Sequence, residues 1–508
     1  MADDGGGGGG GVPPPTTFLS IDQAIERVGT GRFQRKLLLA AGLCFAADSM
    51  EVLLLSFLAV VVQSEWGLTS EQTSSITAAV FLGAMTGTLI LGPLGDKFGR
   101  KPVFVLSAAI IAIFGLLTAV ANSLAVLIII RFMVGVGVGG LVVPFDTVAE
   151  FVPTNMRGYH LLYLGYYWAL GTLLVPILAF ITLGDNENGD EPSGQWRWFT
   201  VLCAIPCIAS TILGIIWVPE SPHWLVYQGR NDKALEVLKI AAKENGLNPD
   251  EVFPMGTMVK PDDQPEVHSV MALLEPEWRN LTLKLWGTWF GFAFLYYGTV
   301  ILVTLVFAEN GSIEGSEGMA QGSYDFDYAA ILLAGSAEMV GQTFVILTVE
   351  TWGRVHTQAL SYLLGGFSVL GLALLEASGS KRGAMMFVAF LARMFMMGSS
   401  STTWVATAEI LPTKIRNTGH AAANAMARLG GAISPFVVST SMSMTTIGII
   451  MGVVSFFTCA LSWSLPETQG KALGTAHTDS FNGGSIQNGT ASIEPPTVEL
   501  TDKTKEII

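Results

Sequence analysis

The chain has 508 residues, of which 50% are hydrophobic and only 13% are charged, and its mean hydropathy is +0.51. This charged fraction excludes an ordinary soluble protein, in which about a quarter of the residues are charged. The formal net charge of −14 comes largely from acidic residues between the apolar runs and in the tails, so it indicates solvated surface and not a nucleic-acid partner.

The first 36 residues are expected to lie on the cytoplasmic side of a membrane. The Gly- and Pro-rich run at 5–15 predicts a disordered tail without a cleavable signal. The string S-I-D-Q at 20–23 predicts a capping box that opens a short amphipathic helix ending near Val28. Arg32, Arg35 and Lys36 then form a basic step before the first apolar run.

Twelve apolar runs follow, each of about 20 residues, which is enough to cross a hydrocarbon core about 30 Å thick. A polar segment at 219–282, with one amphipathic helix closing near Gly246, divides them into six and six. We therefore predict an all-α membrane protein with an N-terminal half at 37–218, a C-terminal half at 283–465 and a disordered cytoplasmic tail at 466–508. The expected spans are 37–62, 75–94, 102–122, 125–150, 160–183, 199–218, 283–308, 327–349, 357–376, 384–409, 420–441 and 445–465.

Basic residues are concentrated in the connections on one side of these spans. The connection at 97–101 alone holds three bases, whereas only Arg197, Lys381 and Arg382 fall on the opposite side. Because Lys and Arg are enriched in cytoplasmic loops, both termini are expected in the cytosol. The sequence leaves open whether the membrane is the plasma membrane or an endomembrane.

Short charged motifs lie at the cytoplasmic ends of the expected spans. The stretch at 92–101 reads G-P-L-G-D-K-F-G-R-K, and its glycines predict a tight turn between the second and third spans. The pattern E-x-x-P-x-x-x-R occurs at 150–157 and again at 409–416, and D-K-F-G-R at 96–100 recurs as E-T-W-G-R at 350–354. Repetition of this kind predicts two duplicated six-helix halves related by an axis normal to the membrane.

Four glycines are crowded into the fourth span, at Gly135, Gly137, Gly139 and Gly140. The run superficially imitates a dinucleotide-binding loop, but no strand precedes it. Small residues let membrane helices approach closely. We therefore interpret the run as a helix-packing surface.

The string at 92–101 resembles the signature loop between helices 2 and 3 of the major facilitator superfamily. P-E-S-P at 219–222 and L-P-E-T at 465–468 resemble sugar-porter signatures. The strings at 48–57 and 408–419 are most similar to the synaptic vesicle 2-related proteins and their plant niacin-transporter-like and organic cation/carnitine-transporter-like relatives. The resemblance covers about 18–473 and implies the major facilitator fold and a transporter rather than an enzyme.

By this resemblance, charged residues at the cytoplasmic helix ends form a salt-bridge gate that holds the two halves together when the protein opens outward. They are conformational parts rather than substrate ligands. Asp146, one turn before the first Glu of the pattern at 150–157, is expected to join them. The residues assigned to this gate are Gly92, Asp96, Gly99, Arg100, Glu150, Arg157, Glu350, Arg354, Glu409 and Arg416.

Two acids, Asp48 and Glu51, lie near the middle of the first span, one helical turn apart. Asp48 matches the aspartate of proton-coupled sugar porters, whose partner is an arginine in span four, matched here by Arg131. The resemblance implies that Asp48 exchanges a proton against Arg131; the alternative is a static ion pair. Glu51 has no such match, and either shares the proton, contacts a cationic part of the substrate or simply pairs with a base.

Five further residues are candidates for substrate binding. Arg428 in span eleven occupies a place where related carriers of anions hold an arginine, and it would either grip a carboxylate or pair with a mid-membrane acid. Trp404 matches the span-ten tryptophan of the sugar-porter pocket, and Tyr296 and Tyr297 are similarly placed aromatics; plain helix packing is the alternative for each. Glu338 either lines the path or makes an interhelical hydrogen bond.

The glutamines with which true hexose carriers bind sugar hydroxyls are missing, because Trp286-Gly287 and Gly165 stand in their places. We therefore predict a proton-coupled secondary transporter that works as a monomer in a lipid bilayer. Its substrate is expected to be a small organic ion, with a niacin-like carboxylate or zwitterion as the first choice. The alternatives are an organic cation carrier, a sugar or polyol carrier, and a non-transporting synaptic vesicle 2-like receptor or regulator. No cofactor motif, metal-ligand spacing or hydrolase triad is visible.

Overall fold

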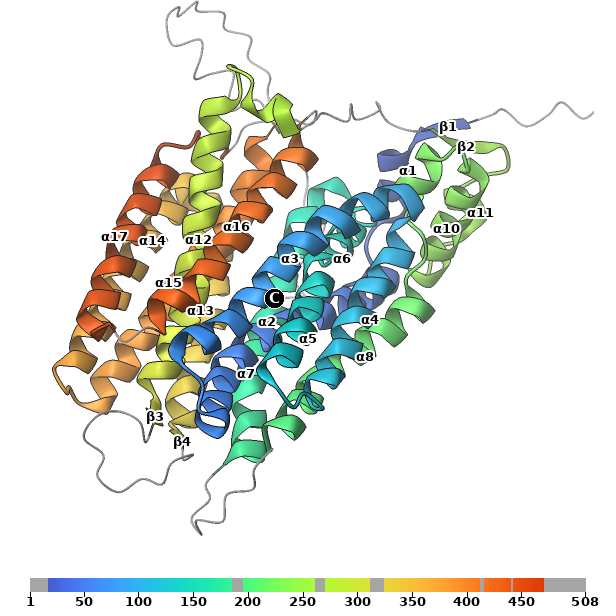
Figure 1. The fold of residues 1–508 in the computed structure, drawn as a ribbon. Coiled ribbons are helices and arrows are strands. Elements are labelled where there is room, and N and C mark those ends of the chain that lie inside the picture. The colour runs from blue at the N-terminus through green and yellow to red at the C-terminus, as the bar shows by residue number, and fades with distance from the viewer. Residues whose placement is uncertain are drawn as a thin grey trace, which may run out of the picture.

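A computed structural model describes residues 17–184, 195–260, 270–310, 324–411, 415–439 and 442–469. In this part of the chain nearly every element is a helix, as Figure 1 shows. Eleven of the helices are long and apolar enough to cross a membrane. The predicted all-α membrane protein is confirmed. The tails expected at 5–15 and beyond Gln469 lie outside the described residues.

The N-terminal half contains the six expected spans. Most of them begin about a turn before the expected apolar run, whereas the third ends at Thr118, before its expected end at 122. The fourth span is divided near Gly140 into two helices, where a single helix was expected. The helices of this half are α2 (Arg32–Trp66), α3 (Ser70–Phe98), α4 (Arg100–Thr118), α5 (Leu124–Gly139), α6 (Val142–Ala149), α7 (Thr154–Leu183) and α8 (Gln195–Trp217).

The C-terminal half repeats this arrangement with six helices. One of them, α16, is long enough to span but is not among the eleven sufficiently apolar helices. Polar side chains along it, among them His420, Asn424 and Arg428, account for this. The helices of this half are α12 (Arg279–Val306), α13 (Tyr328–Trp352), α14 (Arg354–Ala377), α15 (Arg382–Ile410), α16 (Arg416–Val438) and α17 (Met444–Trp463).

Short elements cap one end of the N-terminal half, which we call the α10 end (Figure 1). The predicted capping box is confirmed by two reciprocal bonds between Ser20 and Gln23, of 3.1 and 3.2 Å. Strand β1 pairs in parallel with β2, which joins segments 240 positions apart. These elements are β1 (Thr17–Ser20), α1 (Ile21–Val28), α9 (Pro222–Tyr227), α10 (Asn231–Glu244), α11 (Pro249–Val252) and β2 (Thr257–Lys260). The 3-10 helix η1 (Val270–Leu274) lies at the same end of the C-terminal half.

The opposite end, which we call the β3 end, carries a small antiparallel pair, β3 (Ala308–Asn310) and β4 (Tyr324–Phe326). Near this end the two halves are joined by aromatic packing. The rings of Phe57 and Tyr328 stack with centroids 6.3 Å apart, and Phe326 lies 4.8 Å from Phe57. In Figure 1 the two bundles lean apart toward the α10 end.

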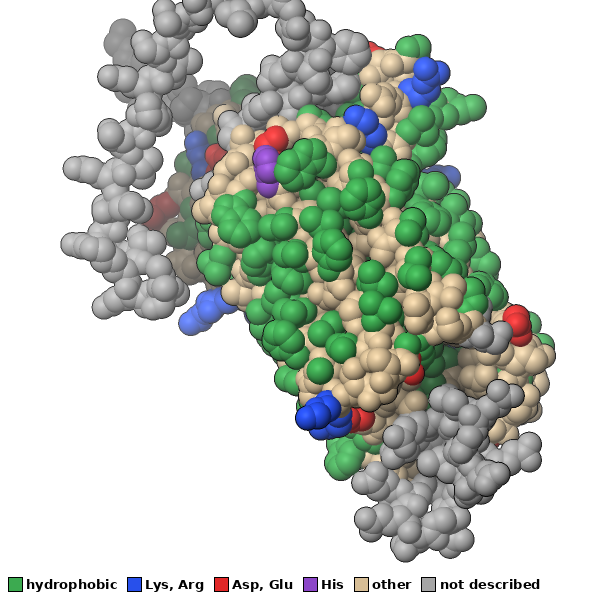
Figure 2. All heavy atoms as spheres, turned by 90° about the vertical axis from the view of Figure 1, so that its left-hand side faces the viewer, with side chains coloured by type: hydrophobic (Ala, Val, Ile, Leu, Met, Phe, Trp, Pro, Cys, Tyr) green, Lys and Arg blue, Asp and Glu red, His purple; other side chains and the backbone are tan. Residues whose placement is uncertain are grey.

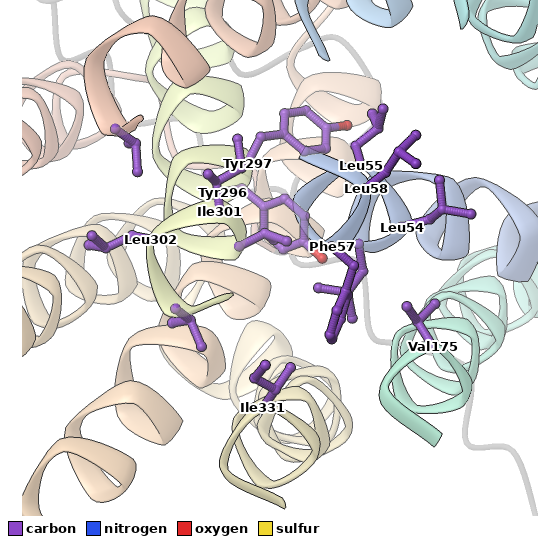
Figure 3. Packing of buried hydrophobic residues seen from close by; sticks show 14 of the residues in the cluster. Leu54, Leu55, Phe57, Leu58, Val175, Tyr296, Tyr297, Ile301, Leu302 and Ile331 are labelled. Carbon is purple, nitrogen blue, oxygen red and sulfur yellow. The ribbon is translucent and has the colours of Figure 1, made fainter. Parts of the chain in front are cut away.

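The largest buried apolar cluster crosses the boundary between the halves (Figure 3). It is built mainly from α2 and α12, the first helix of each half, which are the two most deeply buried helices. Its labelled members are Leu54, Leu55, Phe57, Leu58, Val175, Tyr296, Tyr297, Ile301, Leu302 and Ile331. The polar candidates described below are therefore set into an apolar frame, where an unpaired charge is costly.

The outer surface of the bundle is apolar. Figure 2 shows hydrophobic side chains covering the middle of the C-terminal half, with charged side chains near its two ends. On α17, Val453, Phe456 and Phe457 are all more than half exposed. A surface of this kind matches the hydrocarbon interior of a bilayer.

The glycine run of the fourth span is confirmed as a packing surface. A Cβ atom on Gly135 would lie 2.0 Å from the carbonyl oxygen of Val80, and one on Gly139 would lie 2.1 Å from that of Ala84. The approach is mutual, because Gly83 and Gly87 of α3 meet the backbone of α5 in the same way. Backbone atoms cannot rotate away, so α3 and α5 depend on these glycines.

Replacing Gly135 by alanine is therefore expected to destabilise the protein by about 2–3 kcal/mol, the usual cost of overpacking a tight contact. The measurement is the thermal unfolding midpoint in detergent. Gly158→Ala is the matched control, because Gly158 is a helical residue whose Cβ would meet nothing within 4 Å. An unchanged midpoint for Gly135→Ala would show that the two helices can separate without cost.

Candidate functional site

A buried ion pair joins Glu51 of α2 to Arg131 of α5 inside the N-terminal half. Arg131 is fully buried and also donates from Nη1 to the hydroxyl of Thr118 at 3.3 Å. The expectation that Arg131 pairs with Asp48 is wrong. Positions 48 and 51 differ by about 60° around the helix axis. This rotation directs Glu51 into its own half and leaves Asp48 on another face of α2.

Asp48 is instead associated with residues of the C-terminal half. The charge of Arg428 on α16 acts on Asp48, and the same guanidinium lies against the hydroxyl of Tyr297 on α12. Asp48 is 5% exposed and Arg428 is 7% exposed. Among the described residues, no ion pair within 4.0 Å joins the two. The structure thus places an acid and a base on either side of the boundary between the halves, where they interact electrostatically without forming an ion pair.

A second buried ion pair lies in the C-terminal half, between Glu338 of α13 and Arg393 of α15, at 2.8 Å. Glu338 also accepts hydrogen bonds from the hydroxyl of Tyr296 at 2.6 Å and from that of Thr172 on α7 at 2.9 Å. Trp168, one turn before Thr172, donates to the Tyr296 oxygen at 2.6 Å. The bonds from Thr172 and Trp168 cross between the halves, so Glu338 is held by both.

Sequence reasoning missed Trp168 and Thr172. Their spacing of four residues places them on one face of α7, and this is the only signal that the sequence offered. Next to this face, Gly165 leaves room for Gln342 of α13, whose side-chain carbon Cδ would lie 2.6 Å from a Cβ at position 165. A glutamine at 165, as in hexose carriers, would require the side chain of Gln342 to move from this position.

Trp404 lies in an aromatic cluster nearer the α10 end. Its ring centroid is 4.9 Å from that of Trp289, 5.1 Å from that of His420 and 5.7 Å from that of Phe145. Phe145 belongs to α6 of the N-terminal half, so this cluster also crosses the boundary. Along α12, Phe292 connects it to Tyr296 and Tyr297, with centroids 5.8 Å from Trp289 and 6.3 Å from Tyr296.

The charged motifs of the two halves form matching clusters at the α10 end. Arg100 pairs with Asp96 at 2.9 Å and with Glu150 at 3.0 Å. In the repeat, Arg354 pairs with Glu350 and Glu409, each at 2.8 Å. Each of these four ion pairs lies within one half. Asp146 also acts electrostatically on Arg100. The expected gate between the halves stays a prediction.

Among the described residues, however, no ion pair links one half to the other. Arg157 lies 3.6 Å from Asp22 of α1, and the side chain of Arg416 is outside the described part. Gly92 lies inside α3, with open space around it. The tight turn predicted within 92–101 is present but is narrower than the predicted stretch. Because α3 continues to Phe98 and α4 begins at Arg100, the connection consists of Gly99 alone.

Two glutamates that follow the last helix of each half cap these connections. Glu220 accepts hydrogen bonds from the backbone N–H groups of Arg100 and Lys101, at 2.6 and 3.3 Å, and Glu467 does the same for Arg354 and Val355, at 2.9 and 3.0 Å. A carboxylate at a helix N-terminus is favourable. Although burial opposes it, these backbone bonds hold the pKa of Glu467 below its usual value.

The glycine before each arginine is required by this cap. Gly99 has a φ of 109° and Gly353 a φ of 89°, in the region that side chains rarely adopt. A Cβ on Gly99 would lie 2.2 Å from Oε2 of Glu220, and one on Gly353 would lie 2.5 Å from Oε2 of Glu467. Each half therefore contains one structural unit made of this glycine, the arginine after it and the glutamate that follows the last helix of the half.

Residues 38–479 match the family described as sugar (and other) transporter. The chain belongs to this family. It is 31% identical to the synaptic vesicle 2-related protein of Rattus norvegicus, over 94% of this chain and 86% of that protein. It is 29% identical to organic cation/carnitine transporter 7 of Arabidopsis thaliana, over 83% of this chain and 88% of that protein.

Solved structures of the xylose transporter XylE from E. coli share this fold. A partially occluded inward-open conformation matches with a TM-score of 0.68 at 17% identity, covering 87% of this chain and all of that one. An inward-open conformation matches with a TM-score of 0.67 at 17% identity, covering 88% of this chain and 99% of that one. At this identity the likeness establishes the major facilitator fold.

Family membership settles the general function. The protein is an integral, multi-pass membrane transporter of the sugar-porter type, which binds a small-molecule substrate and lies in a lipid bilayer. Since the family consists of transporters, the prediction that the chain is not an enzyme is confirmed. The roles of the individual site residues in this transporter stay predictions.

Replacing Arg100 by alanine is expected to slow transport while leaving equilibrium substrate binding within a few fold; Asp96→Asn should act in the same direction. The reason is that Arg100 holds the end of α3 to α6 through Asp96 and Glu150 and lies far from the mid-membrane residues. The measurements are uptake rate and equilibrium binding on the same preparation.

Lys97→Ala is the control, because Lys97 lies in the same segment and stacks on Phe98. It removes a positive charge there but breaks neither of the ion pairs that Arg100 makes with Asp96 and Glu150. If Arg100→Ala weakens binding as much as it slows uptake, with unchanged thermal stability, Arg100 is not a purely conformational residue.

Proposed function

We propose that this transporter moves a small organic anion by alternating access and couples this movement to the movement of protons. A niacin-like carboxylate or zwitterion is the preferred substrate. The observation that carries this proposal is the arrangement of Asp48, Tyr297 and Arg428 between the halves. Arg428 is buried next to an acid with which it makes no direct ion pair. Its guanidinium can therefore grip a carboxylate, which it binds through two parallel hydrogen bonds.

Proton coupling follows from the charge of Asp48. An ionised Asp48 would repel a bound carboxylate, and its protonation would relieve this repulsion. Proton entry and anion entry then favour one another. The other two mid-membrane acids are already neutralised, Glu51 by Arg131 and Glu338 by Arg393, so Asp48 is the acid best placed for exchange.

The same pairing favours an anion over an organic cation. A cationic substrate would have to bind Asp48, because the other two acids are paired, and there it would meet the like charge of Arg428. A sugar is disfavoured because Gln342 occupies the space beside Gly165. We propose further that the α10 end faces the cytosol, because most connections rich in Lys and Arg are on this side. One chain contains both halves and the whole candidate site, which supports action as a monomer.

The test is uptake by the purified protein in liposomes with an imposed proton gradient, acidic outside. Nicotinate is expected to accumulate above its external concentration, and to stop doing so when an ionophore collapses the gradient. Competition by nicotinamide, carnitine and xylose distinguishes the alternatives. Strong competition by carnitine but not by carboxylates would favour the cation carrier. The absence of any uptake or exchange would favour a receptor or regulator.

A further inference from the structure

Three buried polar atoms without a partner lie along one face of α16. They are Nε2 of His420, Nδ2 of Asn424 and Nε of Arg428. Residues four apart share a helix face, so the three form one column about 12 Å long. No other helix in the described part of the chain carries three such atoms. Because buried polar groups in native proteins are nearly always paired, a column of three requires an explanation.

The column begins between aromatic rings and ends at a charge. The ring centroid of His420 lies 5.2 Å from that of Trp289 and 5.1 Å from that of Trp404. Trp289 already donates its own N–H to Thr407 at 2.9 Å, so its ring serves as an apolar wall rather than a hydrogen-bond partner. At the other end, Arg428 lies against Tyr297.

The unpaired atoms of Asn424 and Arg428 are both N–H donors, and Nε2 of His420 donates or accepts according to tautomer. Hydrogen-bond donors spaced along one helix face favour a ligand whose acceptor atoms have the same spacing. One turn of helix, about 5.4 Å, is close to the distance across a substituted six-membered aromatic ring. The aromatic walls favour a flat ligand, since stacked and edge-on contacts add to the burial of its surface.

We propose that this column is a two-point binding track for a heteroaromatic carboxylate. Arg428 takes the carboxylate, and Asn424, with His420 beyond it, hydrogen-bonds a second acceptor on the ring. This inference rests on the proposed function and adds to it the group that recognises the ring. It assigns Asn424 and His420 as specificity-determining residues and Trp289 as part of the wall.

The experiment measures binding to the purified full chain by ligand-induced thermal stabilisation, with three probes. Nicotinate has both the carboxylate and a ring acceptor, benzoate lacks the ring acceptor, and nicotinamide lacks the carboxylate. The wild type should bind nicotinate about tenfold more tightly than benzoate, the value of one hydrogen bond in a buried site. Asn424→Ala should remove this preference and leave benzoate binding unchanged, whereas Arg428→Ala should remove binding of both carboxylates.

Thr299→Val is the matched control. It also removes a buried polar atom without a partner, but on α12 and two residues after Tyr297, which is about 200° away around the helix and so on the opposite face from Tyr297. If Asn424→Ala does not fold, the binding of nicotinate and benzoate is compared in His420→Ala and in the wild type instead. Equal binding of nicotinate and benzoate would show that Asn424 and His420 do not recognise the ring and that water bonds their unpaired atoms instead. The proposed function would be unaffected by this result. Failure of every carboxylate to bind would overturn both this inference and the proposed function.

Discussion

Uptake of a carboxylate substrate is expected to fall at least about tenfold when Arg428 is replaced by lysine, although the positive charge is retained. Hydrogen bonds to charged groups are worth about 1.5–3 kcal/mol each. An ammonium group cannot reproduce the planar pair of donors that a guanidinium presents to a carboxylate. Since Arg428 is only 7% exposed, water cannot replace the lost bond. The measurement is initial uptake of nicotinate in liposomes at equal protein content.

Arg382→Lys is the control for this substitution. Arg382 also binds a carboxylate, that of Asp327, but it lies at the exposed β3 end. The same chemical change there should leave uptake unaltered, because exposed ion pairs contribute little. Full uptake by Arg428→Lys would exclude two-point contact with the carboxylate and would leave Arg428 as a partner of Asp48 alone.

The two acids of α2 should behave in opposite ways when each is replaced by its amide. Asp48→Asn is expected to abolish uphill accumulation driven by a proton gradient and to retain exchange, because an amide cannot load a proton but keeps the shape of the side chain. Glu51→Gln is expected to lower stability by about 3–5 kcal/mol, because it leaves the charge of Arg131 buried without compensation. Counterflow, gradient-driven uptake and thermal unfolding of each variant separate the two effects.

Each variant serves as the control for the other, since the positions are one turn apart on the same helix. If Asp48→Asn still concentrates substrate, Asp48 is not an essential coupling residue. If Glu51→Gln retains wild-type stability but loses concentrative uptake, proton exchange belongs to the pair of Glu51 and Arg131 instead.

The spans, α16 among them, were predictable because their apolar runs have the length of a bilayer crossing. The occurrence of equivalent charged motifs in the two halves was also predictable, but the ion pairs that Arg100 and Arg354 make within their own halves were not. The choice of Glu51 over Asp48 as the partner of Arg131 was not predictable. It depends on a rotation of about 60° around α2, which hydropathy does not report.

Contacts between distant segments could not be predicted from the sequence for a similar reason. Thr172 and Trp168 reach Glu338 and Tyr296 only because α7 and α13 face one another across the halves. Strand β1 carries four residues and pairs with a segment 240 positions away, so nothing in its own composition indicates a sheet. Local sequence patterns predict where helices and strands occur. Which faces of these elements meet depends on tertiary packing, which local patterns do not describe.

The cap at the α10 end determines where this chain can be divided. Leu19, Ile25 and Val259 belong to one buried cluster with residues of α2 and α4, whereas Leu273 of η1 packs with the C-terminal half. Two fragments expressed together should therefore reassemble best when the cut follows Lys260. A cut near residue 218 would strip α10 and β2 from the first fragment and expose the apolar faces of α1 and β1.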